Sequence, residues 1–145
     1  MTWATDRLDQ IKAGVVDAPP VVHTLRLGLM DDWGPGWVRK RWDPKHEILN
    51  GDGSMFGGYV AALADQILAF ATMTAIADDA TFRTVNLQLQ FMKIGRAHPL
   101  IIEGRVVASS RQLITVEADF RREDGELIAK AQAQQIVLPG APVFR

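Results

Sequence analysis

Residues 46–72, HEILNGDGSMFGGYVAALADQILAFAT, join a polar, glycine-rich loop to a long helical pattern with one acidic residue among alanines. Apolar residues recur in it at i, i+3, i+4, i+7 and i+11, namely Val60, Leu63, Ala64, Ile67 and Ala71. Since Ser54 suits the N-cap position, the pattern predicts a helix from about Ser54 to Ile76. Such a helix spans about 30 Å, the width of a small domain. The rest of the chain has to cover its apolar stripe.

The segments on either side alternate apolar and polar residues with the period of two that is typical of strands. Before the helix, residues 24–29 and 37–42 are predicted to form a hairpin around the turn at residues 33–36. After it, four more strands are predicted, at residues 82–92, 99–108, 112–121 and 127–138. This order predicts an α+β fold in which an antiparallel sheet of five to six strands wraps one long central helix.

The chain of 145 residues has the length of one domain. A short helix is expected at residues 4–13, a linker at residues 14–22 that contains Pro19-Pro20, and the core at residues 24–138. The formal charge of −1, with scattered basic residues, argues against a nucleic-acid partner. The absence of cysteine excludes a thiol nucleophile and a cysteine-ligated zinc site. Without a signal peptide or a long apolar run, a cytoplasmic protein with no membrane segment is expected.

One motif is specific enough to resemble a known family. Residues 50–58 read N-x-x-G-x-x-x-G-G and are followed by L-A-D at residues 63–65, while F-M-K-I-G at residues 91–95 is similar to an F-L-R-P-G turn. Together they resemble the hotdog-fold acyl-CoA thioesterases, and most of all the phenylacetic-acid-degradation and 4-hydroxybenzoyl-CoA thioesterase group. The resemblance implies the hotdog fold, an acyl-CoA substrate and no cofactor besides the coenzyme A of that substrate. It also implies a homodimer or homotetramer with active sites between subunits.

The residues themselves point to the same chemistry. Hydrolysis of a thioester needs a polarised carbonyl and a carboxylate that activates water or attacks directly. Gly57 lies at a helix N-terminus, where free N–H groups polarise a carbonyl, and Gly58 lets a substrate approach the backbone closely. Asp65 lies off the apolar stripe among alanines, where a partly desolvated base or nucleophile is expected. Gly57 and Asp65 are about 12 Å apart along one helix, so a site that uses both takes them from different subunits.

Further candidates follow from the resemblance. Asn50 matches the loop asparagine that helps to place substrate or water, and Thr84 lies where related enzymes have a hydroxyl that contacts the attacking water. Lys93, with Arg96 and Arg111, is a candidate for the phosphates of coenzyme A. Phe56 departs from the family, which commonly has a histidine donor before the two glycines.

Two alternatives therefore stay open beside the thioesterase. The first is a domain that binds acyl-CoA without hydrolysing it, favoured by Phe56. The second is a hydratase or dehydratase, ranked last because no histidine follows Asp65 within the helix. No metal site is expected, since His23 and His98 have no partner at ligand spacing.

Overall fold

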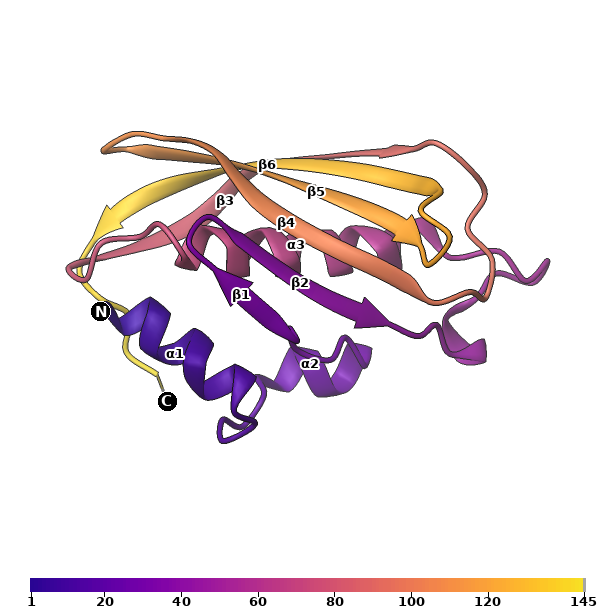
Figure 1. Ribbon diagram of the computed structural model, residues 1–145, viewed down its shortest axis with the longest axis horizontal. Coiled ribbons are helices and arrows are strands. Elements are labelled where there is room, and N and C mark those ends of the chain that lie inside the picture. The colour runs from indigo at the N-terminus through magenta and orange to yellow at the C-terminus, as the bar shows by residue number, and fades with distance from the viewer. Residues whose placement is uncertain (145) are drawn as a thin grey trace.

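The computed structural model describes residues 1–144. One six-stranded antiparallel sheet has the strand order β1-β2-β4-β5-β6-β3. Its strands are β1 (Asp32–Gly34), β2 (Trp37–Trp42), β3 (Ala80–Phe91), β4 (Leu100–Ser109), β5 (Leu113–Arg122) and β6 (Leu127–Pro139). The sheet curves around a single long helix, α3 (Gly57–Met73), which runs along its inner face (Figure 1). The predicted α+β architecture is confirmed.

The apolar stripe of α3 forms the centre of the core. Leu63, Ala64 and Ile67 are fully buried there. Opposite them lie inward-facing residues of three strands, Val38, Ile102, Val116, Ala118 and Phe120. Helix and sheet approach closely at Gly104 in β4, where an added Cβ would lie 3.1 Å from the carbonyl oxygen of Ile67. A glycine at this position therefore sets the depth of α3 in the sheet.

The start of α3 differs from the prediction. The helix begins at Gly57 rather than near Ser54, it ends at Met73 rather than Ile76, and Phe56 occupies the N-cap position without any side-chain cap. The Ser54 hydroxyl instead donates to Asp52 Oδ1 at 2.6 Å within the preceding loop. The expected cap is thus engaged elsewhere, which leaves the N-terminus of α3 open.

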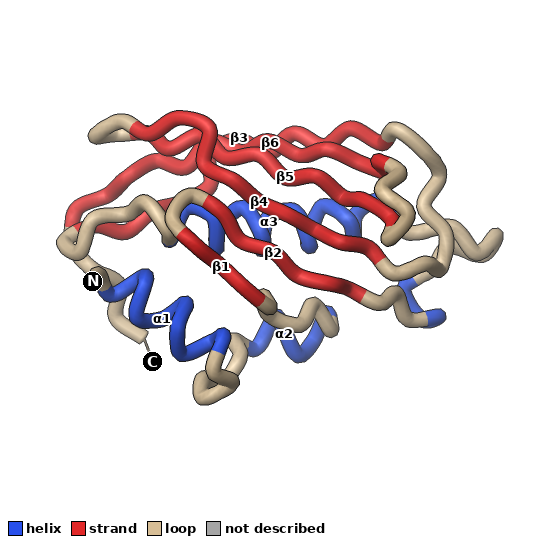
Figure 2. The backbone as a smooth tube through the Cα atoms, viewed as in Figure 1, coloured by secondary structure: helices blue, strands red, loops and turns tan. Residues whose placement is uncertain are grey.

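The N-terminal segment was predicted wrongly in part. Helix α1 (Trp3–Lys12) is confirmed, but a second helix, α2 (Pro20–Leu25), occupies the end of the expected linker. No strand forms at residues 24–29, and the partner of β2 in the hairpin is instead β1 at Asp32–Gly34. Pro20 takes the first helical position, where its missing N–H costs nothing, and Arg26 ends the helix in the left-handed conformation with φ of 53°. Figure 2 shows these two helices on the same side of the sheet as α3. We call α1, α2 and the residues joining them, 3–25, the N-terminal arm.

Strand β3 forms one edge of the sheet, because among the described residues it pairs only with β6. The predicted half-buried alternation holds for Leu87 and Leu89, whereas Val85 and Phe91 are 59% and 55% exposed. A bulge between Thr84 and Asn86 breaks the alternation. None of the helices within residues 1–144 combines the length and apolar character needed to cross a bilayer.

Candidate active site

Asp65 lies on α3 at the wall of a cavity of about 510 Å³ between this helix, the N-terminal arm and the start of β3. The carboxylate is exposed in the single chain, so the expected desolvation is not supplied by this chain alone. The cavity walls are mainly apolar and include Val22, Leu25, Phe70, Met73 and Phe82. An apolar cavity with one carboxylate at its wall fits a ligand that has an apolar body and a reactive polar end.

Thr84 is the nearest polar partner of this carboxylate. Its Oγ1 donates to Asp65 Oδ1 at 3.1 Å and also lies 2.9 Å from Gln135 Oε1 on β6. Thr84 and Gln135 are direct cross-strand partners, and the bulge in β3 follows immediately. Bulges re-aim side chains at the edges of sheets, and this one accompanies the turn of Thr84 toward α3.

A set of side-chain hydrogen bonds holds the wall of the cavity. Side chains of α3 and β2 donate hydrogen bonds to the three consecutive backbone carbonyls that follow α2. Tyr59 Oη donates to Arg26 O at 2.9 Å, Lys40 Nζ to Leu27 O at 2.6 Å, and Gln66 Nε2 to Gly28 O at 2.6 Å. Lys40 Nζ also donates to Gln66 Oε1 at 2.8 Å. These bonds fix the N-terminal arm relative to Asp65, the residue that precedes Gln66.

Lys40 is 1% exposed, although lysine is almost never fully buried without a compensating partner. Burial lowers the pKa of Lys40 from 10.5 to about 8, and the nearby charge of Asp31 opposes part of that change. Two acceptors, a backbone carbonyl and an amide oxygen, take hydrogen bonds from its ammonium group. Lys40 is therefore a structural cation beneath the arm.

Gly57 lies at a different cavity, of about 440 Å³, between the start of α3 and the turn after β3. Within residues 1–144, neither Gly57 N–H nor Gly58 N–H has a hydrogen-bond acceptor, whereas Tyr59 N–H and Val60 N–H both donate to Phe56 O. Two free amides at the positive end of a helix dipole form a suitable site for a developing negative charge.

The aromatic residues around this N-terminus leave little room. A Cβ at Gly58 would lie 2.8 Å from the Phe56 ring, and one at Gly57 would lie 3.1 Å from the Phe91 ring. A side chain at Gly58 would have to displace the Phe56 ring, whereas a methyl group at Gly57 needs only a small shift of the half-exposed Phe91 ring. Phe56 itself is 56% exposed and brings no hydrogen-bond donor to the place where the family commonly has histidine.

Asn50 organises the loop that leads into α3. Its Nδ2 donates to Ser54 Oγ at 3.0 Å and to Met55 O at 3.2 Å. The Met55 N–H in turn donates to Gly95 O at 2.9 Å, which joins this loop to the turn after β3. The amide hydrogens of Asn50 thus hold the loop, and among the described residues its Oδ1 has no side-chain donor.

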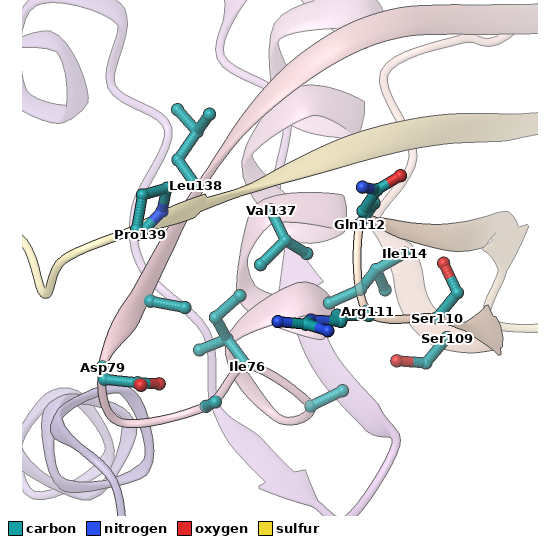
Figure 3. A pocket seen from close by; sticks show the side chains of 13 residues that line it. Ile76, Asp79, Ser109, Ser110, Arg111, Gln112, Ile114, Val137, Leu138 and Pro139 are labelled. Carbon is teal, nitrogen blue, oxygen red and sulfur yellow. The ribbon is translucent and has the colours of Figure 1, made fainter.

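Two of the basic candidates lie at separate places. Lys93 lines the Gly57 cavity and pairs with Glu126 at 3.1 Å. Arg111 lines a third cavity, of about 430 Å³, together with Ser109, Ser110 and Asp79. Figure 3 shows the Arg111 side chain reaching across this cavity toward Ile76. Neither Asp65 nor Gly57 lines it.

The chain thus brings the predicted residues together as two separate groups. Asp65 and Thr84 form one, and Gly57 and Lys93 line the cavity of the other. Sequence reasoning missed Gln135 and Lys40. The alternation of strand β2 carries a signal for Lys40, since it places this lysine on the same face as Val38 and Trp42.

Within residues 1–144, no three histidine, aspartate or glutamate side chains come together as a metal ion would require.

Comparisons with known proteins identify the family of this chain. The chain matches the family described as the thioesterase superfamily over residues 52–129, more than half of its length. It is 30% identical over 94 residues to a protein of Saccharolobus solfataricus named as a candidate esterase, which aligns with 65% of this chain and 66% of that protein. It is also 30% identical over 102 residues to a candidate esterase of Caenorhabditis elegans, covering 68% of this chain and 59% of that one. The chain thus spans less than two thirds of the length of either relative.

Solved structures share the fold over most of the chain. A candidate thioesterase of Ralstonia eutropha, described as phenylacetic acid degradation-related, has a TM-score of 0.78 at 25% identity, covering 88% of this chain and 97% of its own. A Streptococcus mutans protein solved with acetyl CoA has a TM-score of 0.71 at 24% identity, covering 79% and 90%. From the match over residues 52–129 and this shared architecture, the chain belongs to the thioesterase superfamily and has the hotdog fold.

Proposed function

We propose that this protein is an acyl-CoA thioesterase whose active site combines Gly57 of one subunit with Asp65 of another. Membership of the thioesterase superfamily assigns it to the thioester hydrolases. The observation that carries the proposal further is the hydrogen bond from Thr84 to the Asp65 carboxylate beside an apolar cavity. The similar structure solved with acetyl CoA supports a coenzyme A ester as substrate.

Each group has a role that its chemistry fits. The free N–H of Gly57 donates to the thioester carbonyl oxygen, whose negative charge grows in the transition state. Asp65 acts as general base on water or as the nucleophile itself, and Thr84 orients it. Asn50 holds the loop before α3, Gly58 makes room for the Phe56 ring beside the substrate carbonyl, and Lys93 lies where a phosphate of coenzyme A could pair with it.

The two groups meet when a second copy pairs along β3. This strand presents 12 residues at the edge of the sheet, and within residues 1–144 no strand pairs with its outer side, although single chains usually protect such an edge. Val85, Phe91 and Ile94 are exposed along it and the following turn. Antiparallel pairing of two β3 strands would continue the sheet and set the two α3 helices side by side in opposite directions. The N-terminus of one helix would then face the middle of the other.

Subunit complementation tests the proposal. Gly57→Pro removes the donor N–H while suiting the first helical position, and Gly57→Ala is its control because it adds a Cβ at the same place but keeps the N–H. Asp65→Asn removes the charged carboxylate. We expect Gly57→Pro and Asp65→Asn each to lower kcat for acyl-CoA hydrolysis by about a hundredfold or more, measured as thiol release.

Co-expression of the two variants under separate tags then gives mixed dimers. A shared site leaves one intact site in each mixed dimer, because both substitutions fall in the other, so purified mixed dimers should recover about half of the wild-type activity. A site within one chain would leave mixed dimers as inactive as the single variants. That result would refute the shared site, while unchanged turnover in Asp65→Asn would refute the role of the carboxylate.

A second candidate is an acyl-CoA-binding domain without turnover. It is favoured by Phe56, which provides no donor next to Gly57. In this case acyl-CoA esters bind in calorimetry, but a panel of them from acetyl to long-chain and aromatic esters releases no thiol. Steady turnover of any member of that panel excludes it.

A further inference from the structure

Gln135 is a fully buried polar side chain that the reaction described above does not use. It lies on β6 directly opposite Thr84, and its Oε1 is 2.9 Å from Thr84 Oγ1. Thr84 Oγ1 is also 3.1 Å from Asp65 Oδ1. A threonine hydroxyl has a single hydrogen. It therefore cannot donate to the amide oxygen and to the carboxylate at the same time.

The other end of this amide is unsatisfied. Gln135 Nε2 is buried and has no hydrogen-bond partner within residues 1–144. A buried donor left unpaired is costly, and few occur in native proteins. Rotation of the amide by 180° exchanges its oxygen and nitrogen in the same volume. Nε2 then donates to Thr84 Oγ1, and the threonine hydrogen is free for Asp65.

We infer that Gln135 is a positioning residue of the active site, which acts on Asp65 through Thr84. The hydrogen bonds run in one direction, from the Gln135 amide to the Thr84 hydroxyl and from that hydroxyl to Asp65 Oδ1. The acceptor lone pair of Thr84 is occupied, so its hydrogen points to the carboxylate. This arrangement also pairs one of the two unpaired amide hydrogens of Gln135, and it places the amide oxygen where the unpartnered nitrogen was; proteins tolerate an unpaired buried acceptor better than an unpaired donor.

The consequence for catalysis concerns the two oxygens of Asp65. Oδ1 is held by Thr84, which leaves Oδ2 to accept a proton from water or to attack the carbonyl. Fixing the carboxylate rotamer aligns the reacting oxygen before substrate arrives. The inference rests on the proposed function for its effect on rate, but the direction of the hydrogen bonds can be tested without turnover.

The kinetic test is a double-mutant cycle between Gln135→Met and Thr84→Val. Methionine keeps the length of the buried side chain without a donor, and valine keeps the shape of threonine without its hydroxyl. We expect Gln135→Met to lower kcat about fivefold with little change in KM. Thr84→Val should lower kcat about tenfold, and the double variant should be no slower than Thr84→Val alone. Gln134→Met, the neighbouring glutamine on the opposite face of β6, is the control and should match the wild type.

The two effects multiplying in the double variant would show that Gln135 acts independently of Thr84 and would overturn the inference, as would an unchanged kcat in Gln135→Met. Melting temperatures of all variants separate a loss of folding from a loss of alignment.

The direction of the hydrogen bonds is tested by NMR on the wild-type protein. The side-chain amide protons of Gln135 should show cross-peaks to the Thr84 methyl group and shift on Thr84→Val. Cross-peaks that place Nε2 away from Thr84 refute the inference even if the protein hydrolyses thioesters. Conversely, if Asp65→Asn shows that the proposed function is wrong, this spectrum still decides the amide orientation.

Discussion

Substitution of the buried Lys40 by methionine should flatten the pH dependence of stability. Methionine retains the apolar stem of lysine and removes its charge. In the folded chain burial lowers the pKa of Lys40 to about 8 from its ordinary value of 10.5. At about 1.36 kcal/mol per pH unit, holding the charged form in the folded state costs about 3 kcal/mol near pH 7.

This cost disappears as the pH rises. Between pH 8 and 10.5 the folded chain has released the Lys40 proton while the unfolded chain still holds it, so stability increases with pH. The wild type should therefore gain about 2 kcal/mol relative to Lys40→Met between pH 7 and pH 9.5. At pH 7 alone two effects oppose each other, because the variant loses the buried charge but leaves Leu27 O and Gln66 Oε1 without their donor.

Urea denaturation at pH 7, 8 and 9.5 measures this difference, since all other titrating groups are shared and cancel between the two proteins. Parallel pH profiles for wild type and Lys40→Met would refute the reasoning. They would mean that Lys40 stays charged across the range or that the arm opens and admits water to it.

Three further predictions concern the site and its assembly. Val85→Asp places a charge on the open edge of β3, so light scattering should show dissociated subunits and the rate of thiol release should fall about a hundredfold. The control is Val107→Asp on β4, where the valine is similarly exposed, and this variant should change neither measurement. Leu25→Trp fills part of the cavity beside Asp65, so kcat/KM for long-chain acyl-CoA esters should fall at least about tenfold, whereas kcat/KM for acetyl-CoA should change by no more than about twofold. Equal losses for all esters would contradict binding of the acyl group in this cavity. Phe56→His adds a hydrogen-bond donor next to Gly57 and should raise kcat several-fold in the thiol-release assay. A lower kcat would show that packing of the Phe56 ring against Gly58 matters more for turnover than an added donor.

Helices and strands could be predicted from the sequence where the element is long enough to repeat its hydrophobic pattern several times. The stripe of α3 runs over three turns, and the strands after it repeat the alternating pattern often enough to fix their positions within one or two residues. Helix α2 has only six residues, too few to display a helical period, and the alternation of Leu25, Leu27 and Leu29 suggested a strand there. The first residue of this helix, Pro20, was the better signal.

The site could be predicted only in its outline. The spacing of Gly57 and Asp65 along one helix showed that the two cannot act on the same carbonyl, and the structure places them at different cavities. Lys40 and Gln135 were not predicted, because nothing in the sequence indicates the groups to which they hydrogen-bond. Lys40 binds a backbone carbonyl, which every residue has, and Gln135 meets Thr84 across 51 residues through a register that only the folded sheet defines.

Three features of the single chain are incomplete, and the proposed dimer would complete all three. Among residues 1–144, the N-terminus of α3 has two amides without acceptors and no side-chain cap, and β3 has an unpaired edge with apolar side chains. The Asp65 carboxylate is exposed on the same helix. A capping serine at the helix start would satisfy the amides, but it would also occupy the groups that a carbonyl needs. In the proposed dimer, pairing of two β3 edges would cover the apolar side chains and bring each open helix end to the carboxylate of the other copy. The same pairing would then complete both the sheet and the site, so loss of the dimer should abolish turnover even when both Gly57 and Asp65 are intact.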